Sequence, residues 1–218
     1  MPRLLSEKVI DLFGDTMQNT VNKNKYAKEF LVMVRECFSG DVAEDICRMA
    51  NKYSDEYTNA HPDAYLSALK VSYPFAGVYK ALQKYVSKEE ALQMMMDYAP
   101  VIGEKQRKAY WRFTSIPGIP SLLWANFGKI MKVAGGEKAG YKSRIYGVNG
   151  NQAGMDVLSC PVVNALVEIG MPEVAPVMCA IDQVYSTGYR GIKFRRTKSV
   201  AEGDDCCDYR YRRVKKQR

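Results

Sequence analysis

Residues 195–213, near the C-terminus, place the tightest limit on the fold of this 218-residue chain. They contain the sequence Ala-Glu-Gly-Asp at positions 201–204, where glycine can adopt a positive φ and aspartate tolerates turn geometry. Aromatic residues, which favour strands, stand on both sides of this turn: Phe194 before it, and Tyr209 and Tyr211 after it. We therefore predict a C-terminal antiparallel hairpin.

The returning arm of this hairpin has two distinct faces, because side chains alternate along a strand. Cys207, Tyr209 and Tyr211 share one face, whereas Asp208 and Arg210 share the other. Thiol, carboxylate and guanidinium groups thus lie within a few residues of a turn. This combination is unusual for a purely structural hairpin and suggests a site.

A second hairpin is predicted upstream. Residues 144–148 and 155–158 have strand character, and they are separated by Asn149 and Gly150, a favourable turn pair. Two helices, opening at Pro161 and near Pro172, separate the two hairpins. We expect the hairpins to join into one four-stranded antiparallel sheet.

The first half of the chain predicts helices. Apolar residues recur at helical spacing through most of residues 3–110. Asn24 is placed to cap one helix, and Pro62 to begin another. Ser87, followed by Glu90, forms a capping box for a third.

An amphipathic helix is then predicted from Ser121 to the paired glycines at 135–136. The complete pattern is typical of an α+β protein. Residues 1–135 would form a helical region, packed with residues 136–218, which would contain the sheet, two helices and the terminal hairpin in one compact unit.

The net charge of +8 is concentrated in residues 190–218, which contain 11 basic and four acidic side chains. No recognised nucleic-acid motif accompanies this charge, and basic residues also protect strand edges, so we do not expect a nucleic-acid partner. No apolar run reaches the length of a membrane span, and charges interrupt the N-terminus before a signal sequence forms. We expect a cytoplasmic protein with reduced cysteines and no membrane contact, and a homo-oligomer stays open.

The main candidate nucleophile is Cys160. Pro161 suits the first position of a helix and would place Cys160 at the N-cap, where the helix dipole would lower the thiol pKa. The position also suits a small buried side chain. Cys179 and Asp182, one helical turn apart, could form an acid or ligand pair beside it.

Cys207 and Asp208 from the hairpin could complete a pocket with Cys160, Cys179 and Asp182. The three cysteines could alternatively hold a metal, although their long spacings give this only weak support. No phosphate-binding glycine loop or other cofactor motif is evident, so the cofactor and metal requirements stay unknown.

Several short motifs, taken in order, resemble one family. They are Cys160-Pro161, Gly170-Met171-Pro172-Glu173, Cys179-Ala180-Ile181-Asp182, Arg196-Thr197, Glu202-Gly203 and Cys207-Asp208-Tyr209-Arg210. Together they look like the L-2-amino-thiazoline-4-carboxylic acid hydrolase family, most strongly over residues 140–213. The chain departs from the family pattern at Tyr209, where phenylalanine is usual, and in its additional Cys206.

The resemblance implies a small-molecule hydrolase that opens a cyclic amidine at a C–N bond, as the family's namesake opens its thiazoline ring to a carbamoyl-cysteine. A thiolate of Cys160 or Cys207, or an activated water, would attack the amidine carbon. Asp182 or Asp208 would transfer the proton.

Arg196, with Thr197 beside it, is the candidate for binding a substrate carboxylate, because its planar guanidinium fits that group. The alternative is a non-catalytic domain that binds a small ligand or uses its thiols as a sensor.

Overall fold

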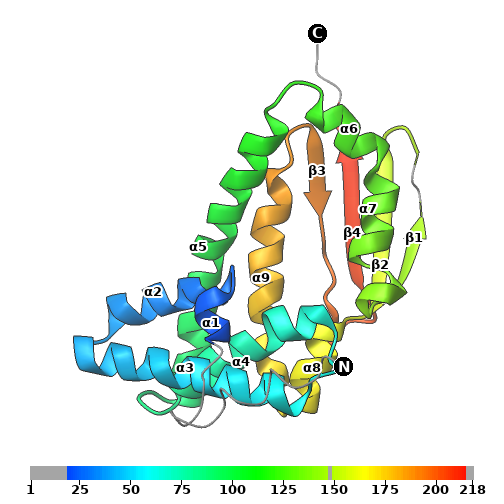
Figure 1. Ribbon diagram of the computed structural model, residues 1–218. Helices are drawn as coiled ribbons and strands as arrows, with labels where there is room; N and C mark the ends of the chain where they lie inside the picture. Colours follow the sequence, from blue (N-terminus) through cyan, green and yellow to red (C-terminus); the bar gives the residue numbers. More distant parts are fainter. Residues whose placement is uncertain (1–18, 147–148, 215–218) are drawn as a thin grey trace, which may run out of the picture.

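The computed structural model describes residues 19–146 and 149–214. It has an α+β fold in which a helical half precedes a four-stranded antiparallel sheet, as predicted (Figure 1). The helices before the sheet are α1 (Thr20–Lys23), α2 (Ala27–Cys37), α3 (Gly40–Ala60), the π-helix η1 (Ala68–Ser72), α4 (Tyr73–Leu82), α5 (Lys88–Thr114), α6 (Ile119–Ala125), α7 (Phe127–Ala134) and the short η2 (Glu137–Ala139).

The second half contains both predicted hairpins and the two helices between them. Its elements are β1 (Lys142–Tyr146), β2 (Gln152–Ser159), α8 (Pro161–Glu168), η3 (Pro172–Val174), α9 (Ala175–Tyr185), η4 (Ser186–Gly188), β3 (Ile192–Arg195), η5 (Val200–Glu202) and β4 (Cys207–Arg213). The strands follow the order β1-β2-β4-β3, so the two hairpins pair through β2 and β4. Residues 147 and 148, which the sequence assigned to the first strand, lie outside the described residues.

The C-terminal hairpin differs from its prediction in one respect. Its strands pair antiparallel, with Phe194 opposite Tyr211, but residues 196–206 form a long loop instead of a tight turn. A side chain holds the loop in place. The Asp208 carboxylate accepts hydrogen bonds from the backbone N–H groups of Thr197 and Lys198, and these bonds replace strand pairing.

The sheet packs one face against helices. Met155 and Val157 of β2 and Tyr211 of β4 pack with α6 and α7 through Trp124 and Phe127. Phe127 contacts the Tyr211 ring edge-to-face at 4.7 Å. Tyr209 on the same face reaches α9, so this face of the sheet forms one wall of the space described below.

Two helix boundaries in the first half also differ from prediction. Pro62 does not begin a helix, because α3 continues to Ala60 and His61 closes it, and helical structure resumes only at Leu66. The predicted helix from Ser121 is divided at Asn126 into α6 and α7.

The helical half and the second half share one hydrophobic core. Ile102 of α5, Val162 of α8 and Ile181 of α9 are all buried in it. Helices α5 and α9 lie side by side (Figure 1). Gly103 permits this approach, since a Cβ there would lie 2.6 Å from a carbon of Val184. Within the described residues, no helix combines the length and apolar character that a bilayer crossing demands.

Asn24 links the start of α2 to the π-helix η1. Its side-chain oxygen accepts the backbone N–H groups of Tyr26 and Ala27 at 2.9 and 2.8 Å, the cap that the sequence predicted. Its amide donates to the carbonyl of Lys70. An α-helix would offer that carbonyl the N–H of residue 74, but Pro74 has none, and the Asn24 amide gives the carbonyl a donor from outside the helix.

We expect Asn24→Ala to lower the free energy of unfolding by about 2–3 kcal/mol, because it removes a helix cap and leaves the Lys70 carbonyl without this donor. Urea unfolding measures the change. Asn164→Ala is the control, since the exposed Asn164 amide contacts only the Ser159 hydroxyl. Equal losses in the two variants would contradict the assignment.

Candidate active site

A small internal cavity of about 140 Å3 lies between the sheet, α8, α9 and η1. Four residues that the sequence singled out line it: Cys160, Cys179, Asp182 and Cys207. At about 30 Å3 per water molecule, the space would hold only a few waters or a small ring. The remaining lining residues are mostly apolar, together with tyrosines: Ser67, Val71, Tyr141, Val157, Val162, Val163, Ala175, Met178, Tyr185, Val200 and Tyr209.

Local structure explains why these four side chains meet. Cys160 is the N-cap residue of α8, as predicted, because Pro161 begins the helix. Cys179 and Asp182 are three residues apart in α9 and therefore face the same side. Cys207 is the first residue of β4, and its side chain points to the helix-covered face of the sheet.

Cys160 is less acidic than the N-cap argument predicted, and the other two thiols of the cavity also have raised pKa values. Burial raises the pKa of Cys160, and this effect outweighs the N–H groups of Val163 and Val162, which lower it. Burial also raises the pKa of Cys179 to about 11, and it raises that of Cys207. At neutral pH all three side chains are therefore predominantly uncharged thiols, so the expectation of a low thiol pKa was wrong.

Asp182 is the carboxyl side chain of the cavity, and only 8% of the residue is exposed. Its Oδ2 accepts a hydrogen bond from the Tyr209 hydroxyl at 2.8 Å and faces the Arg196 guanidinium at 3.3 Å. Its Oδ1 accepts a hydrogen bond from the Ser186 hydroxyl at 3.2 Å. Burial raises the pKa of Tyr185, and a side-chain hydrogen bond with Asp182 adds to this effect.

Arg196 lies behind Asp182 and is not among the residues that line the cavity. Its side chain is 7% exposed, and it also donates to the backbone carbonyl of Cys179 at 3.1 Å. The guanidinium is therefore occupied by two groups of α9. This geometry favours a role in positioning Asp182 over the binding of a substrate carboxylate.

Asp208 and Thr197 lie on the other side of β4, away from the cavity lining. Asp208 accepts hydrogen bonds from the Thr197 N–H and hydroxyl at 2.6 and 2.7 Å, and from the Lys198 N–H at 2.7 Å. Although burial raises the pKa of Asp208, these bonds outweigh burial and lower it overall. The pair anchors the loop from β3 to β4.

The sequence did not reveal the tyrosines of the cavity. Tyr141, from the segment before β1, approaches the Cys160 sulfur, and burial raises its pKa. Tyr185 lies one turn after Asp182 and lines the same space. Tyr209 was assigned to the correct face of β4, but its hydrogen bond to Asp182 depends on contacts between distant segments.

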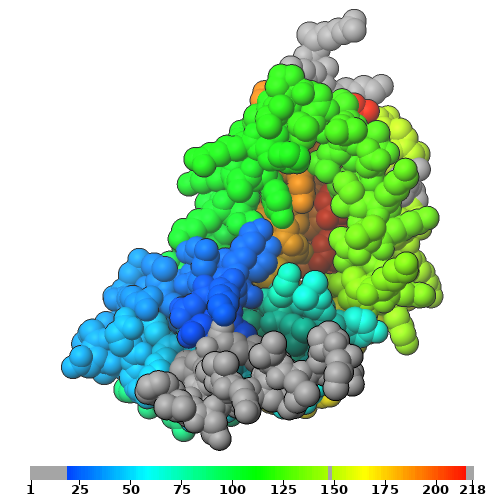
Figure 2. Space-filling view, viewed as in Figure 1, coloured from blue at the N-terminus to red at the C-terminus, as the bar shows by residue number. Residues whose placement is uncertain are grey.

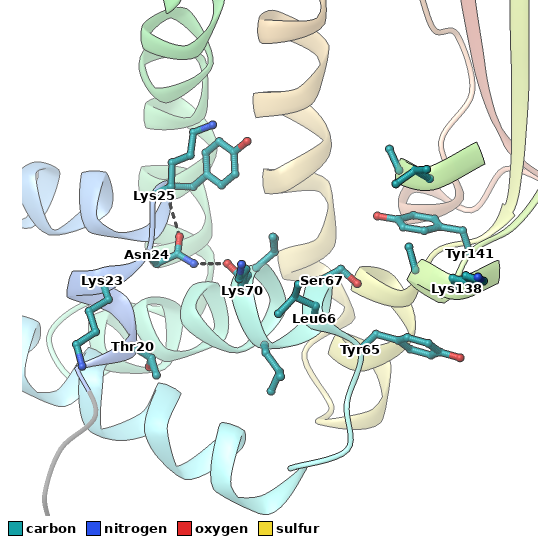
Figure 3. A pocket seen from close by; sticks show the side chains of 16 residues that line it. Thr20, Lys23, Asn24, Lys25, Tyr65, Leu66, Ser67, Lys70, Lys138 and Tyr141 are labelled. Atoms are coloured by element: carbon teal, nitrogen blue, oxygen red, sulfur yellow. Dashed lines mark hydrogen bonds between the residues drawn. The ribbon is translucent and has the colours of Figure 1, made fainter. Parts of the chain in front are cut away.

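A much larger open cavity of about 830 Å3 adjoins the small one and shares three lining residues with it: Ser67, Val71 and Tyr141. Figure 2 shows a hollow between the helices, with α9 and β4 visible at its base. In Figure 3 the Tyr141 hydroxyl points into the larger space, toward the side on which Lys25 lies. We call the smaller space the inner cavity and the larger one the outer cavity.

No group of three histidine, cysteine or acidic side chains in residues 19–146 and 149–214 is arranged to hold a metal ion.

Fold and cavity together define an α+β protein with a buried site of thiols and one carboxylate. The family model described as L-2-amino-thiazoline-4-carboxylic acid hydrolase matches residues 67–211, well over half of the chain. The chain therefore belongs to this family, and the resemblance seen in its motifs is confirmed. The match supports a hydrolase-like function and includes every residue that lines the inner cavity. A comparison with curated proteins finds no match.

Proposed function

We propose that this protein hydrolyses a small cyclic amidine, with 2-amino-thiazoline-4-carboxylate as the first candidate substrate. Family membership and one observation support the proposal: Asp182 lines an inner cavity that is just large enough for a small ring. Because Asp182 is the only carboxylate that the described residues contribute to that lining, we assign it the proton transfers.

In the proposed reaction, Asp182 accepts a proton from water while the water oxygen bonds to the amidine carbon. The ring nitrogen takes this proton from Asp182 as the C=N double bond becomes a single bond. The ring C–N bond then breaks while the hydroxyl proton of the tetrahedral carbon passes through Asp182 to the departing nitrogen, so the nitrogen leaves as an amine and the carbon becomes a carbonyl. The carbon keeps its amino group and gains oxygen, so one water is consumed and a carbamoyl-cysteine leaves. No electrons are exchanged with another reactant.

Water is preferred over a cysteine as the attacking group because the three cavity thiols have raised pKa values. A thiol attacks as its thiolate, and the thiolate fraction at neutral pH is small for Cys179 in particular. The same property works against the alternative of a thiol sensor, since oxidation also follows thiolate character and exposure.

Steady-state turnover of 2-amino-thiazoline-4-carboxylate by single cysteine variants tests the proposal. We expect Cys160→Ala, Cys179→Ala and Cys207→Ala each to retain kcat within about tenfold, because none removes the general base. Loss of 100-fold or more in one variant, with the fold intact by circular dichroism, would identify that cysteine as the attacking group.

Analysis of the product gives a second measurement on the same samples. Cleavage of the ring C–N bond releases an amine, whereas cleavage of the C–S bond releases a thiol that a thiol reagent detects. A stoichiometric thiol signal would contradict the proposed bond. No product with any cyclic amidine would contradict the hydrolase proposal itself.

A further inference from the structure

The outer cavity has a strongly one-sided charge. Four lysines line it, Lys23, Lys25, Lys70 and Lys138, and no aspartate or glutamate of the described residues does. None of the four forms an ion pair within residues 19–146 and 149–214. Exposed lysines in proteins commonly have acidic neighbours, so this arrangement leaves a local excess of positive charge.

Three of the lysines surround the space (Figure 3), whereas the side chain of Lys23 turns away from it. Lys25 comes from the segment before α2, Lys70 from η1 and Lys138 from η2. Lys25 lies over the Tyr26 ring, with Nζ 5.1 Å from its centre, and partial burial lowers its pKa. An anion placed here would restore some of the stabilisation that this ammonium loses by leaving water.

The outer cavity also has an apolar rim. Tyr65, Leu66 and Val133 are 53%, 62% and 76% exposed, so they are available to contact a ligand. Exposed apolar groups that gather around a hollow are typical of a binding site. The rim and the lysines together suit a small organic acid.

The two cavities are continuous at Ser67, Val71 and Tyr141, which belong to both linings. The inner cavity is too small for most ligands by itself, whereas the outer cavity is within the usual range of ligand pockets. Arg196, the residue first considered for a substrate carboxylate, is occupied by Asp182 and Cys179. The lysines of the outer cavity are the basic side chains among the described residues of the two linings.

We propose that Lys25, Lys70 and Lys138 recognise the carboxylate of a ligand through the positive potential that they create together in the outer cavity, while the amidine head of the ligand enters the inner cavity. This inference rests on the proposed function for the amidine head, but the site for the acid is independent of the chemistry. The ligand class is an amidine that carries a carboxylate, and a neutral amidine of the same shape binds more weakly.

The test compares 2-amino-thiazoline-4-carboxylate with its carboxamide, which has nearly the same shape and no acid. The protein variants are the triple variant Lys25→Gln/Lys70→Gln/Lys138→Gln and a control triple, Lys84→Gln/Lys129→Gln/Lys142→Gln. The control loses the same net charge at exposed lysines outside the cavity linings. Dissociation constants come from calorimetry, and kcat/KM is measured wherever product forms.

We expect the wild-type protein and the control to prefer the carboxylate by about tenfold or more at low salt, the scale of one charge-assisted hydrogen bond. The cavity triple should lose this preference and bind the carboxamide as before. Added salt should weaken the preference in the wild-type protein.

Equal affinity of the wild-type protein for the two ligands, a preference retained in the cavity triple, or equal losses in both triples would overturn the inference. Absence of binding by both ligands would also overturn it. Binding with the expected preference but without product would retain the acid site and reject the hydrolase proposal, so the two failures are distinguishable.

Discussion

Asp182→Asn should lower kcat for amidine hydrolysis by about 100- to 10,000-fold, the usual contribution of a general acid or base. The amide keeps the shape of the side chain but cannot accept a proton from water at neutral pH. Steady-state kinetics with 2-amino-thiazoline-4-carboxylate measure the loss. Circular dichroism and urea unfolding verify that the variant is folded under the assay conditions.

The matched control is Asp156→Asn. Asp156 is also an ion-paired carboxylate, 2.9 Å from Arg210, but it lies on β2 away from the inner cavity lining. This variant should keep kcat near the wild-type value. Asp182→Asn with kcat within tenfold of wild type would remove the carboxylate from the proposed chemistry, whatever the cysteine variants do.

Arg196→Met should lower the free energy of unfolding by about 3–5 kcal/mol, because it leaves the buried Asp182 carboxylate without its ionic partner. The side chains of this pair are only 7% and 12% exposed. Denaturation in guanidinium chloride measures the loss. The double variant Arg196→Met/Asp182→Leu should recover much of it, since a buried ion pair can often be replaced by apolar groups at little cost.

Arg35→Met is the control for this stability effect. Arg35 and Glu44 form an ion pair of similar length, 2.9 Å, but their side chains are 48% and 66% exposed. Water screens such a pair, so its removal should change stability little. Similar losses for the Arg35 and Arg196 variants, or no recovery in the double variant, would show that burial of the Asp182–Arg196 pair is not the cause.

Local sequence patterns predicted most elements of this fold. The predicted N-cap at Ser87 is present, with its hydroxyl accepting the N–H of Glu90 at 3.1 Å. The position of Cys160 before Pro161 and the pairing of two hairpins also follow from short-range rules. These features were accessible because neighbouring residues in the chain decide them.

The errors arise where distant contacts override local preference. Residues 196–206 leave the strand because Asp208 and Asp204 bind their backbone N–H groups. The predicted helix is interrupted at Asn126, where two contacts meet. The Trp124 indole N–H donates to the Gly150 carbonyl at 3.1 Å, and the Phe127 ring stacks on the Trp124 ring. No periodicity in the sequence contains this information.

The site itself was only partly accessible from the sequence. Reactive residue types identified four residues that line the inner cavity, but the thiol pKa depends on how deeply the whole fold buries each sulfur. The N-cap rule considers the helix dipole alone. Arg196 was likewise interpreted as an anion-binding group, because its pairing with a carboxylate 14 residues earlier is visible only in three dimensions.

The loop that Asp208 anchors on the outer side of β4 continues to the inner side of the strand, where the cavity lies. Its next residues contact the buried sulfurs: the Ser199 hydroxyl lies 3.6 Å from Cys179, and the Val200 N–H lies 3.3 Å from Cys207. A carboxylate on the outer side of the sheet therefore helps to position two residues that contact sulfurs of the inner cavity. A substitution at Asp208 would release these contacts together, although its side chain lies outside the cavity lining.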